Sequence, residues 1–389
     1  MDFTIPEKLS RMREKVRRFV KEDLEPISRQ VEEEEHIPEE IVDKMRSLGL
    51  FGISIPEAYG GLGLGTLGEV LVYEELTKTN GCFRTRIAGS NGIGSMGILM
   101  DGTEDQKKKY LPRIACGEWT AAFALTEAEA GSDAANIKTT AVFDGNQWIL
   151  NGIKLFITNG DCAHVITTMA LNDENKRARG GITAFIVEKG MSGLSVGTIE
   201  KKMGIRGSHS VELIFRDCLV PKENVIGGED MIGQGFKTAM RVLDKGRLTL
   251  GAAALGASQK LLEMSVYHAK NTIQSGKPLA DSQAIQFMLA DMATQIYAAR
   301  QVLYHTAWLR DQGNQLIHEA SMVKLFCTEM ASQVADKALH VFGDRGYMKE
   351  SQVEMFLRDL RLSRIYEGTS EILRIVIARN LLREQPLSY

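Results

Sequence analysis

The sequence predicts an α+β protein in which a β-rich part lies between two helical parts. The first ~115 residues carry apolar side chains at three- and four-residue spacing, which is typical of helices. Between Trp119 and Val225 the pattern changes to short β-rich runs, and from Gly235 onward long helical runs return. Because a chain of 389 residues is too long for one simple core, we expect three domains, at residues 1–118, 119–232 and 233–389.

Two helices in the first part are predicted from their apolar spacing. One carries Leu9, Met12, Val16, Phe19 and Val20; the other carries Ile41, Met45 and Leu48 and ends at Gly49. A glycine-rich segment follows at residues 55–63. It lacks the Gly-Lys-Ser/Thr sequence of a phosphate-binding loop, so we expect a turn without a nucleotide-binding role.

Short strands are predicted in the middle part and helices in the last part. The β-rich runs are residues 148–150, 156–157, 165–167 and 184–187, and they are separated by Gly, Asn and Asp. The helical runs of the last part include residues 252–255, 288–290 and 325–326. No internal repeat is visible, so the expected layout is helices, then a β domain, then helices.

Composition argues against several classes of function. The net charge of −3 gives no support to nucleic-acid binding. The five cysteines form no Cys-x-x-Cys pair, so we expect a reducing compartment with neither disulfides nor a metal site. The chain opens on Met1-Asp2-Phe3 without the pattern of a signal peptide, and no apolar run is long enough to span a membrane. We expect a cytoplasmic protein, or a mitochondrial matrix protein if this is a mature eukaryotic form.

The most informative stretch for function runs from Arg364 to Thr369 and reads Arg-Ile-Tyr-Glu-Gly-Thr. Glu367 stands alone between an aromatic ring and a glycine, just before an apolar helical run that begins at Ile372. Thr369 or Ser370 can cap that helix by accepting from its free N–H groups. An acid on such a turn, beside backbone donors and an aromatic wall, suits proton abstraction next to a carbonyl. Taken alone, the stretch is also compatible with a surface glutamate in a loop.

Two further segments join Glu367. Residues 123–133 read Phe-Ala-Leu-Thr-Glu-Ala-Glu-Ala-Gly-Ser-Asp, and residues 154–160 read Lys-Leu-Phe-Ile-Thr-Asn-Gly. Together with residues 360–369 they resemble the FAD-dependent acyl-CoA dehydrogenases in order, spacing and layout, over essentially the whole chain. The resemblance implies an N-terminal helical domain, a central β-barrel-like domain and a C-terminal four-helix bundle. It also implies a homotetramer, an acyl-CoA substrate and an electron-transfer flavoprotein as electron acceptor.

The resemblance assigns one group of residues to FAD. A flavin needs donors along its pyrimidine edge and near N5, an aromatic or apolar wall, and donors for its diphosphate. The implied contacts are Leu125 and Thr126 at the isoalloxazine edge, Ser132 at the diphosphate and the substrate, Phe156 against the ring, Thr158 near N5, and Thr369 at the cofactor. The alternative is that Phe156 lies in the core and that Thr126 and Thr158 are ordinary strand residues.

The resemblance also makes Glu367 the catalytic base. It would remove the α proton of a thioester while the β hydrogen leaves as hydride to N5 of FAD. The enolate oxygen would meet the main-chain N–H of Glu367 and a ribityl hydroxyl, and substrate binding would raise the pKa of the base by excluding water. Some family members carry the base on a long helix instead. The corresponding position here is Gly246, which cannot act as a base.

A second group of residues is assigned to the substrate. Tyr366 would wall the thioester pocket, with Gly368 beside it. Arg247 matches a family arginine near the active site, and a helix-surface cation is the alternative. Ser208, with Ser210, falls where the family approaches the CoA arm, although these could also be plain polar loop residues.

The chain departs from the family at four positions that in the family help hold the ADP half of FAD across a subunit boundary. Thr272 and Ser275 stand in place of an arginine and a phenylalanine, and His340 and Asp344 in place of a glutamine and a glycine. Arg345 could replace the lost cation, because a guanidinium can grip phosphate with two hydrogen bonds. Asp344 opposes this unless it orients the arginine. We therefore predict weaker or rewired FAD binding with the chemistry retained.

Arg84 bears on the substrate. It lies in Cys82-Phe83-Arg84-Thr85-Arg86 and aligns with an arginine that glutaryl-CoA dehydrogenases use for the distal carboxylate. A cation in an acyl pocket needs an anion, since a buried unpaired charge is costly. We therefore expect a dicarboxylic substrate, such as a glutaryl- or substituted succinyl-CoA, with Gly246 leaving room for a bulky substituent. The alternative is that Arg84 pairs with a structural acid or lies at the surface.

Three other functions are alternatives to a dehydrogenase that acts on a dicarboxylic acyl-CoA. A medium- or long-chain fatty acyl-CoA dehydrogenase would use the same chemistry. An acyl-CoA oxidase passes electrons to oxygen, but such enzymes usually carry an extra C-terminal domain, and this chain stops soon after Leu382. A non-catalytic scaffold relative would explain the altered ADP-site residues, but it has no need of Glu367, Thr158 and Ser132.

Overall fold

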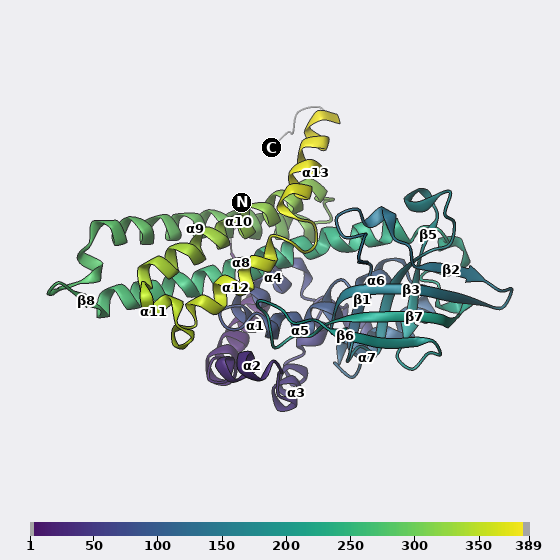
Figure 1. Ribbon diagram of the computed structural model, residues 1–389, viewed down its shortest axis with the longest axis horizontal. Coiled ribbons are helices and arrows are strands. Elements are labelled where there is room, and N and C mark those ends of the chain that lie inside the picture. Colours follow the sequence, from purple (N-terminus) through teal and green to yellow (C-terminus); the bar gives the residue numbers. More distant parts are fainter. Residues whose placement is uncertain (1–3, 384–389) are drawn as a thin grey trace.

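The computed structural model describes residues 4–383; Met1 to Phe3, on which the expectation about a signal peptide rests, lie outside the described residues. Helices form both ends of the chain and a sheet forms its middle, as the sequence predicts (Figure 1). Within residues 4–383, no helix combines the length and the apolar character needed to cross a membrane.

The first part is helical. Its helices are α1 (Glu7–Phe19), α2 (Ser28–Glu34), α3 (Glu39–Ser47), α4 (Gly65–Leu76), α5 (Cys82–Asn91), α6 (Met96–Asp101) and α7 (Glu104–Ala115). The two helices predicted from apolar spacing are α1 and α3. Gly49 follows α3 with φ 72°, a left-handed conformation that glycine adopts without strain and that commonly ends helices.

The middle part is a curled seven-stranded sheet that forms a half-barrel. Its strands are β1 (Ala121–Ala124), β2 (Thr140–Phe143), β3 (Gln147–Thr158), β4 (Val165–Leu171), β5 (Ile182–Glu188), β6 (Leu194–Ile199) and β7 (Ser210–Pro221). They run in the order β1-β4-β2-β3-β7-β6, and β5 pairs with β4. The runs at 148–150 and 156–157, predicted as separate strands, belong to the single strand β3, whose pairing with β7 shifts register between Lys154 and Ile157.

The last part is again helical. Its elements are α8 (Gly235–Asn271), β8 (Ile273–Gln274), β9 (Lys277–Pro278), α9 (Gln283–Asp311), α10 (Ile317–Phe342), α11 (Asp344–Tyr347), α12 (Val353–Ser363) and α13 (Ser370–Arg383). The expected bundle is present: α10 packs on α8, α9 and α12, and α8 also packs on α9 and α12. The β8–β9 hairpin and α11 lie together at the end of the bundle farthest from the sheet (Figure 1).

One hydrophobic core joins the first and third parts, and α4 runs through it. Leu71 and Leu76 of α4 share this core with Leu248 and Leu255 of α8. Every residue of α4 from Thr66 to Leu76 is buried, as expected for a helix with neighbours on all sides. The first helical part is therefore the support on which the third part rests, and α4 is fixed between them.

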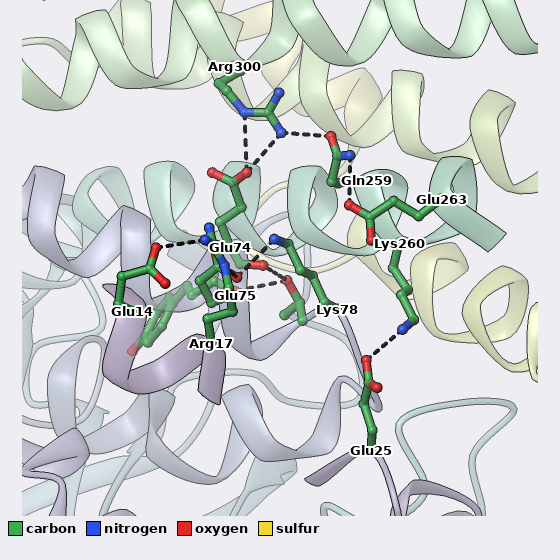
Figure 2. Close-up of polar contacts among 12 residues, drawn as sticks. Glu14, Arg17, Glu25, Glu74, Glu75, Lys78, Gln259, Lys260, Glu263 and Arg300 are labelled. Atoms are coloured by element: carbon green, nitrogen blue, oxygen red, sulfur yellow. Dashed lines mark hydrogen bonds and ion pairs between the residues drawn. The ribbon is translucent and has the colours of Figure 1, made fainter. Parts of the chain in front are cut away.

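Two acids on α4 fasten it to its neighbours (Figure 2). Glu74 accepts from Nε and Nη2 of Arg300 on α9, at 3.2 and 2.9 Å. Glu75 accepts from Arg17 of α1 and from Lys78, each at 2.8 Å. A cavity of about 480 Å³ borders this network. Both carboxylates lie on the side of α4 that faces α1 and α9. The remaining side of α4 packs against other helices, including α8.

The start of α4 is capped by a residue distant in sequence, which gives a stability prediction. Asp311, the last residue of α9, accepts from the main-chain N–H of Thr66 at 2.6 Å and of Leu67 at 2.9 Å. We expect Asp311→Ala to lower the free energy of unfolding by about 1–2 kcal/mol, because two helix-terminal donors lose their acceptor. Thermal and urea unfolding measure this. Asp291, also on α9, makes only an exposed ion pair with Lys337 of α10. Asp291→Ala should therefore change the free energy of unfolding by less than about 0.5 kcal/mol; equal effects of the two substitutions would contradict the prediction.

Candidate active site

The turn that carries Glu367 joins α12 to α13 and is held in a strained conformation. Glu367 has φ 53°, in the left-handed region where a side chain other than glycine is disfavoured. Such strain costs about 1–3 kcal/mol and persists only when the surroundings impose it. The main-chain N–H of Ser370 bonds to the Arg364 carbonyl at 3.1 Å, and the Thr369 hydroxyl accepts from the N–H of Ile372 at 3.2 Å. Thr369 is therefore the cap of α13, one of the two residues expected in that role.

Lys324 of α10 holds the same turn through a hydrogen bond to its backbone. Its ammonium donates to the Gly368 carbonyl at 2.7 Å, and the residue has no exposed surface. Burial lowers the pKa of Lys324 to about 8, against the attraction of the nearby Glu367 carboxylate. Sequence reasoning did not identify Lys324, because it lies inside an ordinary amphipathic helix pattern and meets the turn only in the folded chain.

The Glu367 carboxylate points at α8 and touches Gly246. Oε2 is buried and has no hydrogen-bond partner within residues 4–383. A Cβ atom added at Gly246 would lie 2.1 Å from Oε2, so any other residue at this point of the helix would displace the end of the Glu367 side chain. Burial raises the pKa of Glu367, while Arg84, Lys324 and Arg247 oppose that rise through their positive charge. The result is a carboxylate that binds a proton more tightly than an exposed glutamate does.

Arg84 lies inside the molecule, next to the same turn of α8. Its side chain is 4% exposed, and Nη2 donates to the Thr249 hydroxyl at 3.0 Å. Thr249 in turn donates to the Gly246 carbonyl at 2.8 Å. Nε of Arg84 is buried without a hydrogen-bond partner, and among the described residues no carboxylate lies within ion-pair distance of the guanidinium. Neither alternative for Arg84, the surface or a structural ion pair, matches this position.

The other residues assigned to the substrate lie at varied depths. Arg247 is buried rather than on the helix surface, and its Nη1 donates to Asp244 at 2.5 Å and to Ser321 at 3.0 Å. Tyr366 borders a cavity of about 40 Å³ that Arg84 also lines, and burial raises the pKa of its hydroxyl to about 12.

Two more of these residues complete the group. Gly368 takes φ 95° beside the base, a conformation open to glycine. Ser208 is buried with no partner for its hydroxyl in the described part of the chain.

The residues assigned to the flavin ring come together on the sheet. The Leu155 N–H donates to the Thr126 carbonyl at 2.9 Å, so the two sequence motifs lie side by side. Phe156 sits at the register shift of β3 with φ 59° and is 59% exposed. An aromatic side chain held outward on a strained bulge is unusual and rules out the alternative that Phe156 lies in the core. Leu125 is buried, Thr158 is half-buried at the end of β3, and Ser132 is exposed.

Three polar residues that sequence reasoning missed hold these two motifs in place. Lys154 is completely buried and pairs with Glu127 at 2.7 Å. The other Glu127 oxygen accepts from the main-chain N–H of Lys138 at 2.6 Å. Asn159, directly after β3, donates to the carbonyls of Thr85 and Arg86 at 3.3 Å. The end of β3 is thereby tied to α5, the helix that carries Arg84.

The residues assigned to the ADP half of FAD lie elsewhere. Thr272 ends α8, Ser275 occupies the β8–β9 turn with φ 50°, and His340, Asp344 and Arg345 are exposed at the end of α10 and the start of α11. This is the end of the bundle farthest from the sheet (Figure 1). The main-chain N–H of Arg345 donates to the Asp344 carboxylate at 2.8 Å. One copy of the chain therefore does not bring the two groups of FAD residues together.

The donor set on the sheet suits a flavin. Phe156 offers an aromatic face, and the half-buried Thr126 and Thr158 flank it with hydroxyl groups. Asn159 links the end of β3 to α5, which carries the buried guanidinium of Arg84, and the charge of Arg84 acts on the Glu367 carboxylate, whose pKa is raised. An acid of this kind can remove a proton, and the aromatic face can hold a ring that accepts a hydride.

Comparison with known proteins gives the same assignment. The models for the N-terminal, middle and C-terminal domains of acyl-CoA dehydrogenase match residues 6–118, 122–218 and 233–382. A chain of the structure described as an electron transferring flavoprotein of Acidaminococcus fermentans is 41% identical, with a TM-score of 0.95, and the match covers 99% of this chain and 100% of that one.

Two further solved structures are similar over nearly their whole length. Butyryl-CoA dehydrogenase from Megasphaera elsdenii is 37% identical with a TM-score of 0.95, covering 98% of this chain and 100% of that one. A glutaryl-coenzyme A dehydrogenase in complex with glutaryl-CoA is 32% identical with a TM-score of 0.93, covering 98% and 97%. The chain belongs to the acyl-CoA dehydrogenase family.

Proposed function

We propose that Glu367 is the base of this FAD-dependent acyl-CoA dehydrogenase and removes the α proton of the bound thioester. The observation that carries the proposal is the Glu367 carboxylate, whose Oε2 is buried, lacks a hydrogen-bond partner in the described chain and presses on Gly246. Burial raises the pKa of Glu367, which brings it closer to the value that suits a general base at neutral pH. Because the base acts in its ionised form, activity should rise with pH through this pKa.

Backbone donors at the turn support the same role. Within residues 4–383 the main-chain N–H of Glu367 has no hydrogen-bond partner, and the left-handed conformation fixes its direction. An oxyanion that forms on the thioester carbonyl can accept from such a donor, which costs no reorganisation during the reaction. Lys324 keeps the turn in place through Gly368. The base and the donor then belong to one rigid segment.

Bound FAD supplies the acceptor for the hydride that leaves the β carbon. Its ring would be held by Leu125, Thr126, Phe156 and Thr158. Ser132 would contact the diphosphate, and Thr369 is also assigned to the cofactor. The residues assigned to its ADP half stand at the far end of the bundle (Figure 1). We infer that a second copy of the chain provides that end, which fits the homotetramer expected for the family.

We also infer that electrons pass to an electron-transfer flavoprotein. The support is the 41% identical chain in a structure described as an electron transferring flavoprotein. Anaerobic reduction by an acyl-CoA, followed by slow reoxidation in air, would separate this function from that of an oxidase. A cytoplasmic location stays a prediction.

For the substrate, we propose a short acyl-CoA with a carboxylate at its far end. Arg84 is joined to Gly246 through Thr249, and Gly246 touches the base. Thr249 lies three positions after Gly246 on the helix, a rise of about 4.5 Å, which is roughly the reach of a short dicarboxylic acyl chain beyond its α carbon. The similar structure with bound glutaryl-CoA supports this substrate class. An unsubstituted short acyl group is the second candidate, favoured by the similarity to butyryl-CoA dehydrogenase.

Two substitutions test the role of Glu367. Glu367→Gln removes the base and should slow anaerobic bleaching of the flavin by butyryl- or glutaryl-CoA by about 10²–10⁴-fold. Gly246→Ala should slow it by about 10²-fold, because the new Cβ would displace the carboxylate by about 1 Å or more. Stopped-flow absorbance measures both. Glu371→Gln, an exposed acid one turn further along, should leave the rate unchanged; normal bleaching by Glu367→Gln would refute the assignment.

The role of Arg84 is tested by a ratio of specificities. In Arg84→Gln, kcat/KM for glutaryl-CoA should fall about 30-fold or more relative to butyryl-CoA, because a buried carboxylate would lose its cation. Steady-state assays with both substrates give the ratio. Arg86→Gln is the matched control, since Arg86 lies on the same helix but donates to Thr120. An unchanged ratio, or a wild-type enzyme that oxidises butyryl-CoA and no dicarboxylyl-CoA, would exclude the dicarboxylic substrate.

The rewired ADP site is tested by cofactor affinity. Arg345→Ala should weaken FAD binding by about tenfold or more, since a charge-assisted hydrogen bond to phosphate would be lost. The dissociation constant follows from flavin fluorescence on dilution. Lys349→Ala removes another exposed cation at the same end of the bundle and should have little effect. FAD affinity that is ordinary for the family and insensitive to Arg345→Ala would contradict the rewiring.

A further inference from the structure

Glu69 is a buried acid that the proposed mechanism does not use. It lies on the face of α4 opposite Glu74 and Glu75 and has no exposed surface. Neither of its carboxylate oxygens has a hydrogen-bond partner in the described part of the chain. The nearest cation is the ammonium of Lys245 on α8, 3.6 Å from Oε2. Lys245 and the Tyr73 hydroxyl both act on the pKa of Glu69, but neither makes a hydrogen bond of normal geometry to it, which is rare for a buried carboxylate and leaves its oxygens able to bond to another group.

Tyr73 and Arg84, two neighbours of Glu69, also carry buried polar atoms without a hydrogen-bond partner among the described residues. Tyr73 follows Glu69 by one helical turn, and its buried hydroxyl has no partner within residues 4–383. The Arg84 guanidinium lies 5.0 Å from the centre of the Tyr73 ring, and its Nε is also unpaired. The three side chains therefore bring unsatisfied donors and acceptors together, and the charges of Arg84 and Glu69 both act on the pKa of Glu367.

The chemistry of this cluster selects among acyl groups. A plain alkyl chain would leave these buried polar atoms unpaired, which is unfavourable. A terminal carboxylate can accept from Arg84 and Tyr73, but it would bring a second anion next to Glu69. Two carboxylates in contact do not both stay ionised; they share a proton.

We propose that Glu69 and Tyr73 form, with Arg84, the subsite for the terminal carboxylate of the acyl group, and that Glu69 takes up a proton from solvent as this carboxylate enters. The neutral Glu69 then donates its O–H to the incoming carboxylate, and no other bond forms or breaks. The inference rests on the proposed dicarboxylic substrate and adds to it the residue that makes room for the second charge.

The charges around Glu69 fix the direction of its pH dependence. Lys245, Arg84 and Arg310 face it with positive charge, and Tyr73 and Glu367 are its other titratable neighbours. Burial raises the pKa of Glu69, and Lys245 and Arg84 limit that rise. Above this pKa the free enzyme holds Glu69 ionised, so affinity for a carboxylated ligand should fall by up to about tenfold for each pH unit. A ligand without the carboxyl group should not show this extra dependence.

Isothermal titration calorimetry on the FAD-loaded enzyme tests the inference. The probes are a glutaryl-CoA analogue with a methylene in place of the thioester carbonyl, which cannot be oxidised by loss of an acidic α proton, and its pentyl counterpart without the carboxyl group. Titrations at several pH values, in two buffers of different ionisation enthalpy, count protons. At pH values above the pKa of Glu69, the carboxylated probe should take up more protons than the pentyl probe. This comparison needs no variant.

Three variants assign the proton. Glu69→Gln should abolish the extra uptake and remove the pH dependence of the affinity ratio between the probes. Tyr73→Phe should weaken only the carboxylated probe, by about fivefold. Glu75→Gln, also on α4 but bonded to Arg17 and Lys78 (Figure 2), should behave as wild type.

The outcomes distinguish the proposal of a dicarboxylic substrate from the inference that Glu69 takes up a proton. If the carboxylated probe does not bind, the dicarboxylic substrate and this inference both fail. If it binds with no extra proton uptake, only the inference fails. Extra uptake that persists in Glu69→Gln would assign the proton to another group, with Lys245 the nearest, and would overturn the inference as well.

Discussion

The Glu367 carboxylate has to be sheltered from water and still be able to carry a charge, and much of the surrounding structure follows from this requirement. Burial raises its pKa, and the positive charges of Arg84, Lys324 and Arg247 limit that rise. Oε2 accepts no hydrogen bond from the described residues, so the cations stabilise the ionised form through their charge and leave Oε2 able to accept a proton. The strained turn, the buried Lys324 and the glycine at position 246 all keep this carboxylate in one place.

The parts of this arrangement that depend on local sequence could be predicted. The Tyr366-Glu367-Gly368 turn, the cap at Thr369 and the order of helices and sheet are set by neighbouring residues and by apolar spacing. The motif around Phe156 indicated a flavin wall, and the exposed ring at a strained bulge matches that expectation. The continuity of β3 was missed, because Gly152 and Asn151 look like breakers in sequence, while pairing with β7 carries the strand through them.

The parts that depend on distant partners could not be predicted. Lys324 and Glu69 each sit in a helix where a charged residue reads as a solvated position, and only the fold shows that both are buried. Lys154 and Glu127 read as ordinary strand and loop charges until they meet at 2.7 Å. The separation of the two groups of FAD residues is likewise a property of the whole bundle, whose length places α11 and β8 far from the sheet (Figure 1).

The contact between Gly246 and Glu367 also constrains how such a site can change over time. Some members of the family carry the base on the long helix, yet here a Cβ at position 246 would lie 2.1 Å from Oε2 of Glu367. A side chain at position 246 and the Glu367 carboxylate would therefore compete for the same space. If Glu367 is the base, as proposed, a base on the long helix and a base on this turn are alternative solutions, and a change at one position requires a compensating change at the other.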